Sequence, residues 1–332
     1  MIISRTPFRI SFFGGGTDYP GWYEEYGGSV LSTTIDKYCY ITIRYLPPFF
    51  EHKYRIVYSK IENVKCISEI QHKAVRALLE FCKIEKGVEI HHDGDLPARS
   101  GLGSSSAFTV GLLHSLYALR GTMVSKFQLA KEAIHLERDI LKENVGSQDQ
   151  IAVAYGGFNK IIFAKNKDFR VEPVTLNKAK IQQIQNYLML VFTGITRFAS
   201  EIARHQINNI PNKKEELKIM HQMVEEAMEI LNSNKDILEF GRLMHKAWEL
   251  KKSLSEKISN TRIDNIYTAA LKAGAVGGKL LGAGGGGFML LFVPPERHQN
   301  VREALKKLLE VKFCFENEGS QIIYYTPQEE VK

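Results

Sequence analysis

Residues 97–107, with the sequence PARSGLGSSSA, constrain the fold of this chain more than any other segment. A strand-like stretch at 88–92 precedes them, and between Ser104 and Leu119 apolar residues recur at helical spacing. The sequence therefore predicts that a strand and a turn lead into a glycine- and serine-rich loop, which opens directly into an apolar helix.

A loop of this kind is suited to bind phosphate. Gly101 and Gly103 let the backbone adopt positive φ and approach a ligand closely. The N–H groups of the first helical turn have no partner within the helix, and together with the helix dipole they attract anions. Serine hydroxyls beside them can reach a phosphate oxygen or Mg²⁺. The alternative is an elaborate helix N-cap, in which serines are also common.

Two other nucleotide-binding loops do not fit the sequence. If Gly278 and Lys279 belonged to a Walker loop, position 273 would be glycine and position 280 would be serine or threonine. The chain has Ala273 and Leu280 instead. The glycines of 97–107 are followed by serines, so the third glycine of a dinucleotide fingerprint is missing.

Three further segments combine glycines with reactive side chains. They are 7–19 (PFRISFFGGGTDY), 146–150 (GSQDQ) and 279–288 (KLLGAGGGGF). A glycine tract alone is typical of a linker or a tight turn. The strand-like residues 288–293 that follow the last segment favour a turn whose backbone closely approaches a ligand or the loop at 97–107.

Segments 7–19, 97–107 and 279–288 resemble, in the same order, the three motifs of the GHMP kinases, a superfamily that includes galactokinase and mevalonate kinase. The resemblance spans the whole chain. The GGGTDYP and GSQDQ variants are most similar to the branch of D-glycero-D-manno-heptose 7-phosphate kinases, and fucokinase-like domains are the nearest alternative. The resemblance implies a two-lobed α+β fold, with an N-terminal lobe like ribosomal protein S5 at 1–185. The C-terminal lobe, 186–332, would be helical with a small antiparallel sheet.

The resemblance also implies ATP as the phosphoryl donor and assigns roles to individual residues. Asp149 would accept or orient the proton of the acceptor hydroxyl, and Arg9 would offset charge on the transferred group. Ser105 and Glu137 would hold Mg²⁺. Plain alternatives are a helix cap for Asp149 and a solvated helix position for Glu137. ATP would contact the loop through Pro97, Arg99, Gly101, Leu102, Gly103, Ser104, Ser105 and Ser106.

The expected acceptor is a sugar that already carries a phosphate. Galactokinases have Glu-His where this chain has Gly15 and Gly16, so an anion is absent and space is gained. Arg197 could bind the phosphate, unless it only pairs with Glu201 one helical turn later. The substrate-binding residues expected in all are Gly15, Gly16, Thr17, Asp18, Arg197, Gly284 and Gly285.

These assignments predict phosphorylation of the anomeric hydroxyl of a heptose 7-phosphate. The 1,7-bisphosphate product would serve the synthesis of nucleotide-activated heptose and surface polysaccharide. The alternatives are a kinase for an unphosphorylated sugar such as fucose or galactose, and a ligand sensor without catalysis. The presence of Arg9, Ser105, Glu137 and Asp149 together favours an enzyme over a sensor.

Composition is consistent with these expectations. A chain of 332 residues with 44% hydrophobic residues is long enough for two lobes. The net charge of +7 is scattered among acids and accompanies no nucleic-acid motif, which favours small anionic ligands over nucleic acid. The apolar stretches are too short for a membrane span, and the N-terminal one too short for a signal peptide. We therefore expect a cytoplasmic protein without membrane partners, with a homodimer possible.

The C-terminal part has a distinct pattern. Lys-, Glu- and Leu-rich stretches at helical spacing predict helices, and apolar runs near the end predict a strand–helix–strand unit. The helices are expected at 197–209, 213–232, 235–253 and 261–273, and the unit at 286–293, 296–312 and 320–325. In the N-terminal part, the patterns predict a strand at 2–13 and helices at about 68–83 and 125–142.

Overall fold

The computed structural model describes residues 1–98, 100–195 and 199–327. Within them, the larger sheet has nine strands, and its main path runs β13-β1-β2-β5-β3-β4 with β6, β7 and β12 attached to the side. All pairs are antiparallel except β3–β5. The strands are β1 (Ile2–Phe13), β2 (Gly28–Tyr45), β3 (Tyr54–Val57), β4 (Ile61–Val64), β5 (Val88–Gly94), β6 (Phe158–Phe163), β7 (Phe169–Pro173), β12 (Phe315–Glu316) and β13 (Gln321–Tyr325).

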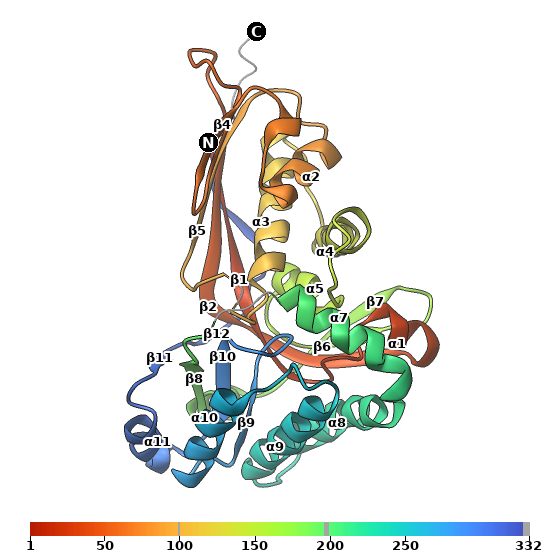
Figure 1. Ribbon diagram of the computed structural model, residues 1–332, viewed down its shortest axis with the longest axis vertical. Helices are drawn as coiled ribbons and strands as arrows, with labels where there is room; N and C mark the ends of the chain where they lie inside the picture. Colours follow the sequence, from red (N-terminus) through yellow and green to blue (C-terminus); the bar gives the residue numbers. More distant parts are fainter. Residues whose placement is uncertain (99, 196–198, 328–332) are drawn as a thin grey trace.

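Helices cover one face of this sheet (Figure 1). The central one, α3 (Ser104–Leu119), packs on β1 and β2 and buries small and apolar residues around most of its circumference. Gly111 brings the helix close to the sheet, because a Cβ there would lie 2.8 Å from Oγ1 of Thr6. The other helices of this lobe are α1 (Pro20–Tyr26), the 3₁₀-helix η1 (Ile67–Glu69), α2 (Lys73–Phe81), α4 (Lys126–Ile134), the π-helix η2 (His135–Ile140), α5 (Gln148–Tyr155) and α6 (Lys178–Asn186).

The second lobe lies below the first in Figure 1 and combines helices with a four-stranded antiparallel sheet of order β11-β8-β10-β9. Aromatic packing joins the lobes, since Phe12 and Phe13 at the end of β1 both contact Phe240 of α9. The elements of this lobe are α7 (Ala199–Asn209), η3 (Ile210–Asn212), α8 (Lys214–Asn232), α9 (Leu238–Ser253), α10 (Thr261–Lys272), η4 (Pro295–Arg297), α11 (His298–Ala304), β8 (Leu188–Phe192), β9 (Gly277–Leu280), β10 (Phe288–Phe292) and β11 (Leu309–Val311).

The structure confirms the α+β class, the strand at 2–13, the helix at 104–119 and, within the described residues, the four C-terminal helices. Two expectations at the C-terminal end were wrong. The helix predicted at 296–312 ends at Ala304, because Leu309–Val311 pairs instead with β8 as strand β11. The strand at 320–325 does not complete the C-terminal sheet but pairs with β1 in the first lobe.

Three differences in the first lobe have local causes. The helix expected at 68–83 begins only at Lys73, where the His72 side chain caps it. The helix expected at 125–142 changes to π-helical geometry after Ile134. Strand β4 was missed because its four residues carry little periodicity. The division after residue 185 remains a proposal, and β12 and β13 cross back over it. No helix in the described ranges is both long and apolar enough to cross a membrane.

Candidate active site

The loop before α3 has the left-handed backbone that its glycines predict. Gly101 has φ +82° and Gly103, the N-cap residue, has φ +73° and ψ +24°. A Cβ on Gly103 would lie 3.1 Å from Cγ of Arg9 and 3.5 Å from Oδ2 of Asp149. Glycine is therefore required at 103 both for its backbone conformation and for the approach of two charged side chains.

Arg9 and Asp149 form a bidentate ion pair against this loop. Arg9 donates from Nε and Nη2 to the two carboxylate oxygens of Asp149, each at 2.8 Å. Its third nitrogen, Nη1, donates to the carbonyl of Gly101 at 2.6 Å, and its backbone N–H donates to the carbonyl of Leu102 at 2.9 Å. The Arg9 side chain is 3% exposed and that of Asp149 is 26% exposed, so only the carboxylate is open to a ligand.

Glu137 lies beside the same helix terminus in a different environment. Its side chain is buried in the π-helical turn and accepts hydrogen bonds from Ser106 Oγ at 2.9 Å and from Gln150 Nε2. Burial raises the pKa of Glu137 to about 7, although the side chains of Thr109, Gln150 and Ser106 act in the opposite direction as hydrogen-bond donors. Its Oε1 atom is buried and lacks a well-aligned hydrogen-bond partner among the described residues. A carboxylate oxygen of this kind fits a hard cation.

The fit to Mg²⁺ depends on few protein groups. Mg²⁺ commonly keeps several waters and uses one or two carboxylates together with substrate phosphates. Glu137 can supply the carboxylate, and Ser105, exposed at the start of α3, can supply a hydroxyl. The hydroxyl that contacts Glu137 is that of the next residue, Ser106.

The turn after β1 is held by its own threonine. Thr17 donates from Oγ1 to the carbonyls of Gly14 at 2.8 Å and of Ser29 at 2.9 Å. The Thr17 side chain is fully buried, so its hydroxyl connects two segments of backbone. Gly14, with φ +80°, has no space for a Cβ, which would lie 2.0 Å from the Ser29 carbonyl oxygen.

Asp18 lies at the floor of the same turn. Its Oδ1 accepts from the Gly16 N–H at 2.9 Å, and its Oδ2 accepts from Gln148 Nε2 at 3.0 Å. Burial raises the pKa of Asp18, and the charge of Asp149 adds to this effect. A Cβ at Gly146 would lie 1.9 Å from Oδ2 of Asp18, which explains that glycine of the GSQDQ segment.

The third glycine-rich segment packs against the phosphate loop. A Cβ on Gly282 would lie 2.5 Å from Cα of Gly101, and one on Gly287 would lie 2.2 Å from the Ser100 carbonyl oxygen. Gly284 and Gly285 face the connection between α9 and α10, where the N–H of Gly285 donates to the carbonyl of Ile258 at 2.8 Å. The close approaches in this segment are thus made to protein backbone.

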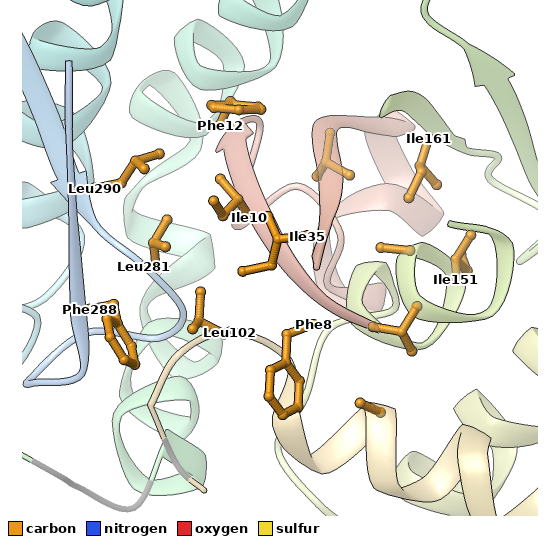
Figure 2. Packing of buried hydrophobic residues seen from close by; sticks show 14 of the residues in the cluster. Phe8, Ile10, Phe12, Ile35, Leu102, Ile151, Ile161, Leu281, Phe288 and Leu290 are labelled. Carbon is orange, nitrogen blue, oxygen red and sulfur yellow. The ribbon is translucent and has the colours of Figure 1, made fainter. Parts of the chain in front are cut away.

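The predicted residues fall into two groups around the start of α3. Arg9, Gly101, Gly103 and Asp149 contact one another, and Ser106 contacts Glu137. The remaining loop residues surround them: Pro97 is exposed, Leu102 is fully buried and Ser104 begins α3. Figure 2 shows Leu102 among buried side chains of both lobes, with Phe8 on one side and Phe288 on the other. Arg99 and Arg197 lie outside the described residues.

Four residues of the site region were missed by the sequence interpretation. Gln148 and Gln150 lie on either side of Asp149 in the GSQDQ segment, so their position was a signal. Lys251 and Lys279 are buried beside the third glycine segment. Lys251 follows Trp248 by one helical turn on the apolar face of α9. A lysine among apolar residues at helical spacing was the available signal that this side chain is buried.

Comparison with known proteins places this geometry in a family. The profile of the GHMP kinases N terminal domain matches residues 68–157, and that of the GHMP kinases C terminal domain matches residues 223–311. The chain belongs to the GHMP kinase family.

Its relatives include sugar kinases. The chain is 31% identical over 320 residues to D-glycero-alpha-D-manno-heptose 7-phosphate kinase of Campylobacter jejuni, covering 92% of this chain and 93% of that enzyme. It is 25% identical over 326 residues to the bifunctional fucokinase/GDP-fucose pyrophosphorylase of Arabidopsis thaliana, covering 91% of this chain and 31% of that protein. A D-glycero-D-manno-heptose 1-phosphate kinase from Bacteroides thetaiotaomicron has the same fold, with TM-score 0.81 and 24% identity over 98% of this chain and all of the other.

Proposed function

We propose that the protein transfers the γ-phosphoryl group of ATP to the anomeric hydroxyl of D-glycero-D-manno-heptose 7-phosphate, giving the 1,7-bisphosphate. The observation that carries this proposal is the Arg9–Asp149 ion pair, which lies directly against the left-handed glycines of a phosphate loop. A carboxylate that faces a phosphate site is the arrangement that phosphoryl transfer to a hydroxyl needs.

Asp149 contacts the acceptor in this proposal. Its carboxylate orients the attacking hydroxyl and accepts the hydroxyl proton as the bond to phosphorus forms. The bidentate contact with Arg9 fixes the orientation of this carboxylate. Because the transition state of phosphoryl transfer is loose, orientation contributes more than early proton removal.

Arg9 has a second role, toward the transferred group. Its guanidinium is fixed by Asp149 and by the carbonyl of Gly101, so its charge needs no rearrangement during the reaction. This positive charge offsets negative charge that develops on the acceptor oxygen and on the phosphoryl group.

The helix terminus supplies the donor site. The loop at 100–106 and the first N–H groups of α3 bind the phosphates of ATP. Glu137 and Ser105 would hold Mg²⁺, which when bound would neutralise charge on the phosphate oxygens. The hydrogen bonds from Ser106 and Gln150 keep the Glu137 carboxylate in place with Oε1 available.

The acceptor site is assigned to the turn that contains Gly15, Gly16 and Asp18. Asp18 is assigned to the sugar hydroxyls, and Gly15 leaves room for the end of the sugar that carries phosphate, whereas a Cβ on Gly16 would lie 3.0 Å from Cδ2 of Leu217. Gly15 has the space required, since a Cβ there would meet nothing closer than Gln148 Nε2 at 3.8 Å. Thr17 shapes the turn, and Arg197, Gly284 and Gly285 are retained as proposed contacts. We also retain a cytoplasmic location and a possible homodimer.

A panel assay of ADP release tests the proposal. The acceptors are heptose 7-phosphate, heptose 1-phosphate, unphosphorylated heptose, fucose and galactose, with ATP and Mg²⁺. The expected result is the highest kcat/KM for heptose 7-phosphate, with a product phosphorylated at both ends. Higher kcat/KM for heptose 1-phosphate would move the reaction to the other end of the sugar. No ADP release from any acceptor would remove the kinase assignment.

A second candidate is a kinase of an unphosphorylated sugar. The similarity to the Arabidopsis fucokinase over 91% of this chain supports it. The absence of a carboxylate at Gly15 and Gly16 speaks for the phosphorylated acceptor instead. The same panel separates the two, because this candidate requires fucose or free heptose to be the better acceptor.

A further inference from the structure

A buried lysine reaches the third glycine segment from α9. Lys251 is 7% exposed, and its Nζ donates to the carbonyl of Leu280 at 2.9 Å and to the carbonyl of Gly282 at 2.5 Å. These two carbonyls lie at the point where β9 ends and the glycine turn begins. The ammonium group thus fixes the backbone at the entry of the turn.

The fixed part of the turn touches the phosphate loop directly. Gly282 is so close that a Cβ on it would lie 2.5 Å from Cα of Gly101, and a Cβ on Gly101 would lie 2.5 Å from the carbonyl oxygen of Leu281. No side chain separates the two backbones. The Gly101 carbonyl in turn accepts the hydrogen bond from Arg9 Nη1, so contacts run from Lys251 to the Arg9–Asp149 pair.

A second buried lysine connects the same region to β1. Lys279, in β9, donates from Nζ to the carbonyl of Phe12 at 2.7 Å. Phe12 follows Arg9 by three residues on β1. The glycine turn is therefore tied to α9 by Lys251, while the strand that leads into it is tied to the catalytic strand by Lys279.

Packing alone does not explain a charge at position 251. Burying an ammonium group is unfavourable unless its protons are hydrogen-bonded, and methionine would fill similar space without that cost. Burial lowers the pKa of Lys251 to about 7, and the nearby charges of Arg9, Asp18 and Asp149 act on it as well. The lysine lies in an environment that disfavours its charge, and its two hydrogen bonds to the turn are the contacts that a methionine could not make.

We propose that Lys251 is a positioning residue for phosphoryl transfer. By holding the carbonyls of Leu280 and Gly282, it keeps the glycine turn pressed on Gly101 and so fixes the phosphate loop and Arg9. It does so through the turn, without contact with ATP or the acceptor. The kinetic part of this inference rests on the proposed function, whereas the structural part does not.

The experiment compares Lys251→Met with Lys251→Arg, which keeps donors at this position. Lys246→Met is the matched control, because Lys246 is exposed on the same helix. Amide hydrogen exchange without nucleotide is measured first. In Lys251→Met we expect about 10-fold faster exchange in segments 100–106 and 280–288, and unchanged exchange in the strands of the first lobe. Lys246→Met should match wild type throughout.

Kinetics supply the second readout. A small misplacement of catalytic groups can lower rates by as much as about 100-fold, so we expect kcat of Lys251→Met to fall about 10- to 100-fold. KM for the acceptor should change less than 3-fold, and Lys251→Arg should recover much of kcat. A purely structural role would lower the melting temperature but leave kcat unchanged below it.

The outcomes are separable. If folded Lys251→Met has the exchange and kcat of wild type, Lys251 is not a positioning residue. If wild type itself shows no turnover, the proposed function fails, and the exchange data alone decide whether Lys251 orders the loop. If Lys251→Met does not fold, Lys251→Gln, which keeps one donor, replaces it in both measurements.

Discussion

Gln150 donates its side-chain N–H to the carboxylate of Glu137, and the residue before it, Asp149, is bound by Arg9. Helix α5 therefore carries, on consecutive residues, a contact to each half of the site. The Glu137 carboxylate, assigned to the cation, and the Asp149 carboxylate, assigned to the acceptor, are therefore both positioned by α5.

Replacement of Asp149 by asparagine should leave ATP binding intact and lower turnover. The amide cannot accept the hydroxyl proton, and loss of a general base typically lowers the rate by about 10² to 10⁴. ADP release measures the rate and calorimetry measures ATP affinity. Asp168→Asn, at an exposed position, is the control. An Asp149→Asn variant with turnover near that of wild type would exclude this role.

Substitution of Gly103 should weaken nucleotide binding, in addition to the folding stability that any side chain loses at a positive φ. Gly103→Val should abolish ATP binding in a folded protein, because a Cβ would lie 3.1 Å from Cγ of Arg9. Gly121→Ala is a matched control, since Gly121 also has positive φ, +66°, but a Cβ there meets nothing within 4 Å. That control should lose only about 1–2 kcal/mol of stability and bind ATP normally. Tight ATP binding by Gly103→Val would contradict the loop assignment.

Glu137→Gln should weaken the Mg²⁺ dependence without destabilising the fold. The amide removes a buried charge, so the melting temperature should be unchanged or higher. The Mg²⁺ concentration for half-maximal rate should rise about 10- to 100-fold, as it does when support for a metal site is lost. Glu226→Gln, an exposed change on α8, should alter neither quantity. An unchanged Mg²⁺ requirement would remove Glu137 from the site.

A carboxylate at position 15 should repel a phosphorylated acceptor. Gly15 has room for a side chain, so Gly15→Glu and Gly15→Gln differ mainly in charge. We expect KM for heptose 7-phosphate to be about 10-fold higher for Gly15→Glu than for Gly15→Gln, because the new carboxylate would repel the phosphate of the acceptor. KM for ATP should be equal in the two variants. Equal acceptor KM values would place the phosphate elsewhere.

Arg197→Met tests the proposed grip on the acceptor phosphate. A charged hydrogen bond of this kind contributes about 1.5–3 kcal/mol, so its loss should raise the acceptor KM about 10- to 150-fold. KM for ATP should stay constant. No change in the acceptor KM would retire Arg197.

Stability should depend on pH through Lys251. The pKa of this lysine is about 7 in the folded protein and 10.5 in its ordinary state, so between these values the unfolded chain binds more protons. The free energy of unfolding of wild type, relative to Lys251→Met, should therefore rise with pH in this window, by up to about 1.4 kcal/mol per pH unit. Urea unfolding of both proteins at several pH values measures the slope. A flat difference would mean that Lys251 keeps its ordinary pKa.

The phosphate loop and the start of α3 could be predicted from local sequence. A helix beginning at Ser104 and glycines in the left-handed region follow from the residues of the loop themselves. The contacts of Lys251 and Lys279 could not be read in the same way, since their partners are backbone carbonyls 29 and 267 residues away along the chain. Glu137 is an intermediate case. Its place on a helix was predicted, but its burial depends on π-helical geometry that propensity does not encode.

The pairing of β13 with β1 has a consequence for how the protein is made. Strand β1 carries Arg9, and at residues 2–5 one of its edges pairs with β13, although Arg5 and Gln321 are 316 residues apart along the chain. At about 5–20 residues per second, the nascent chain exposes an open sheet edge for tens of seconds, and such edges invite aggregation. A truncation that removed residues 321–325 would therefore leave this edge of β1 unpaired at 2–5, so that a late lesion in the sequence acts on a strand made long before it.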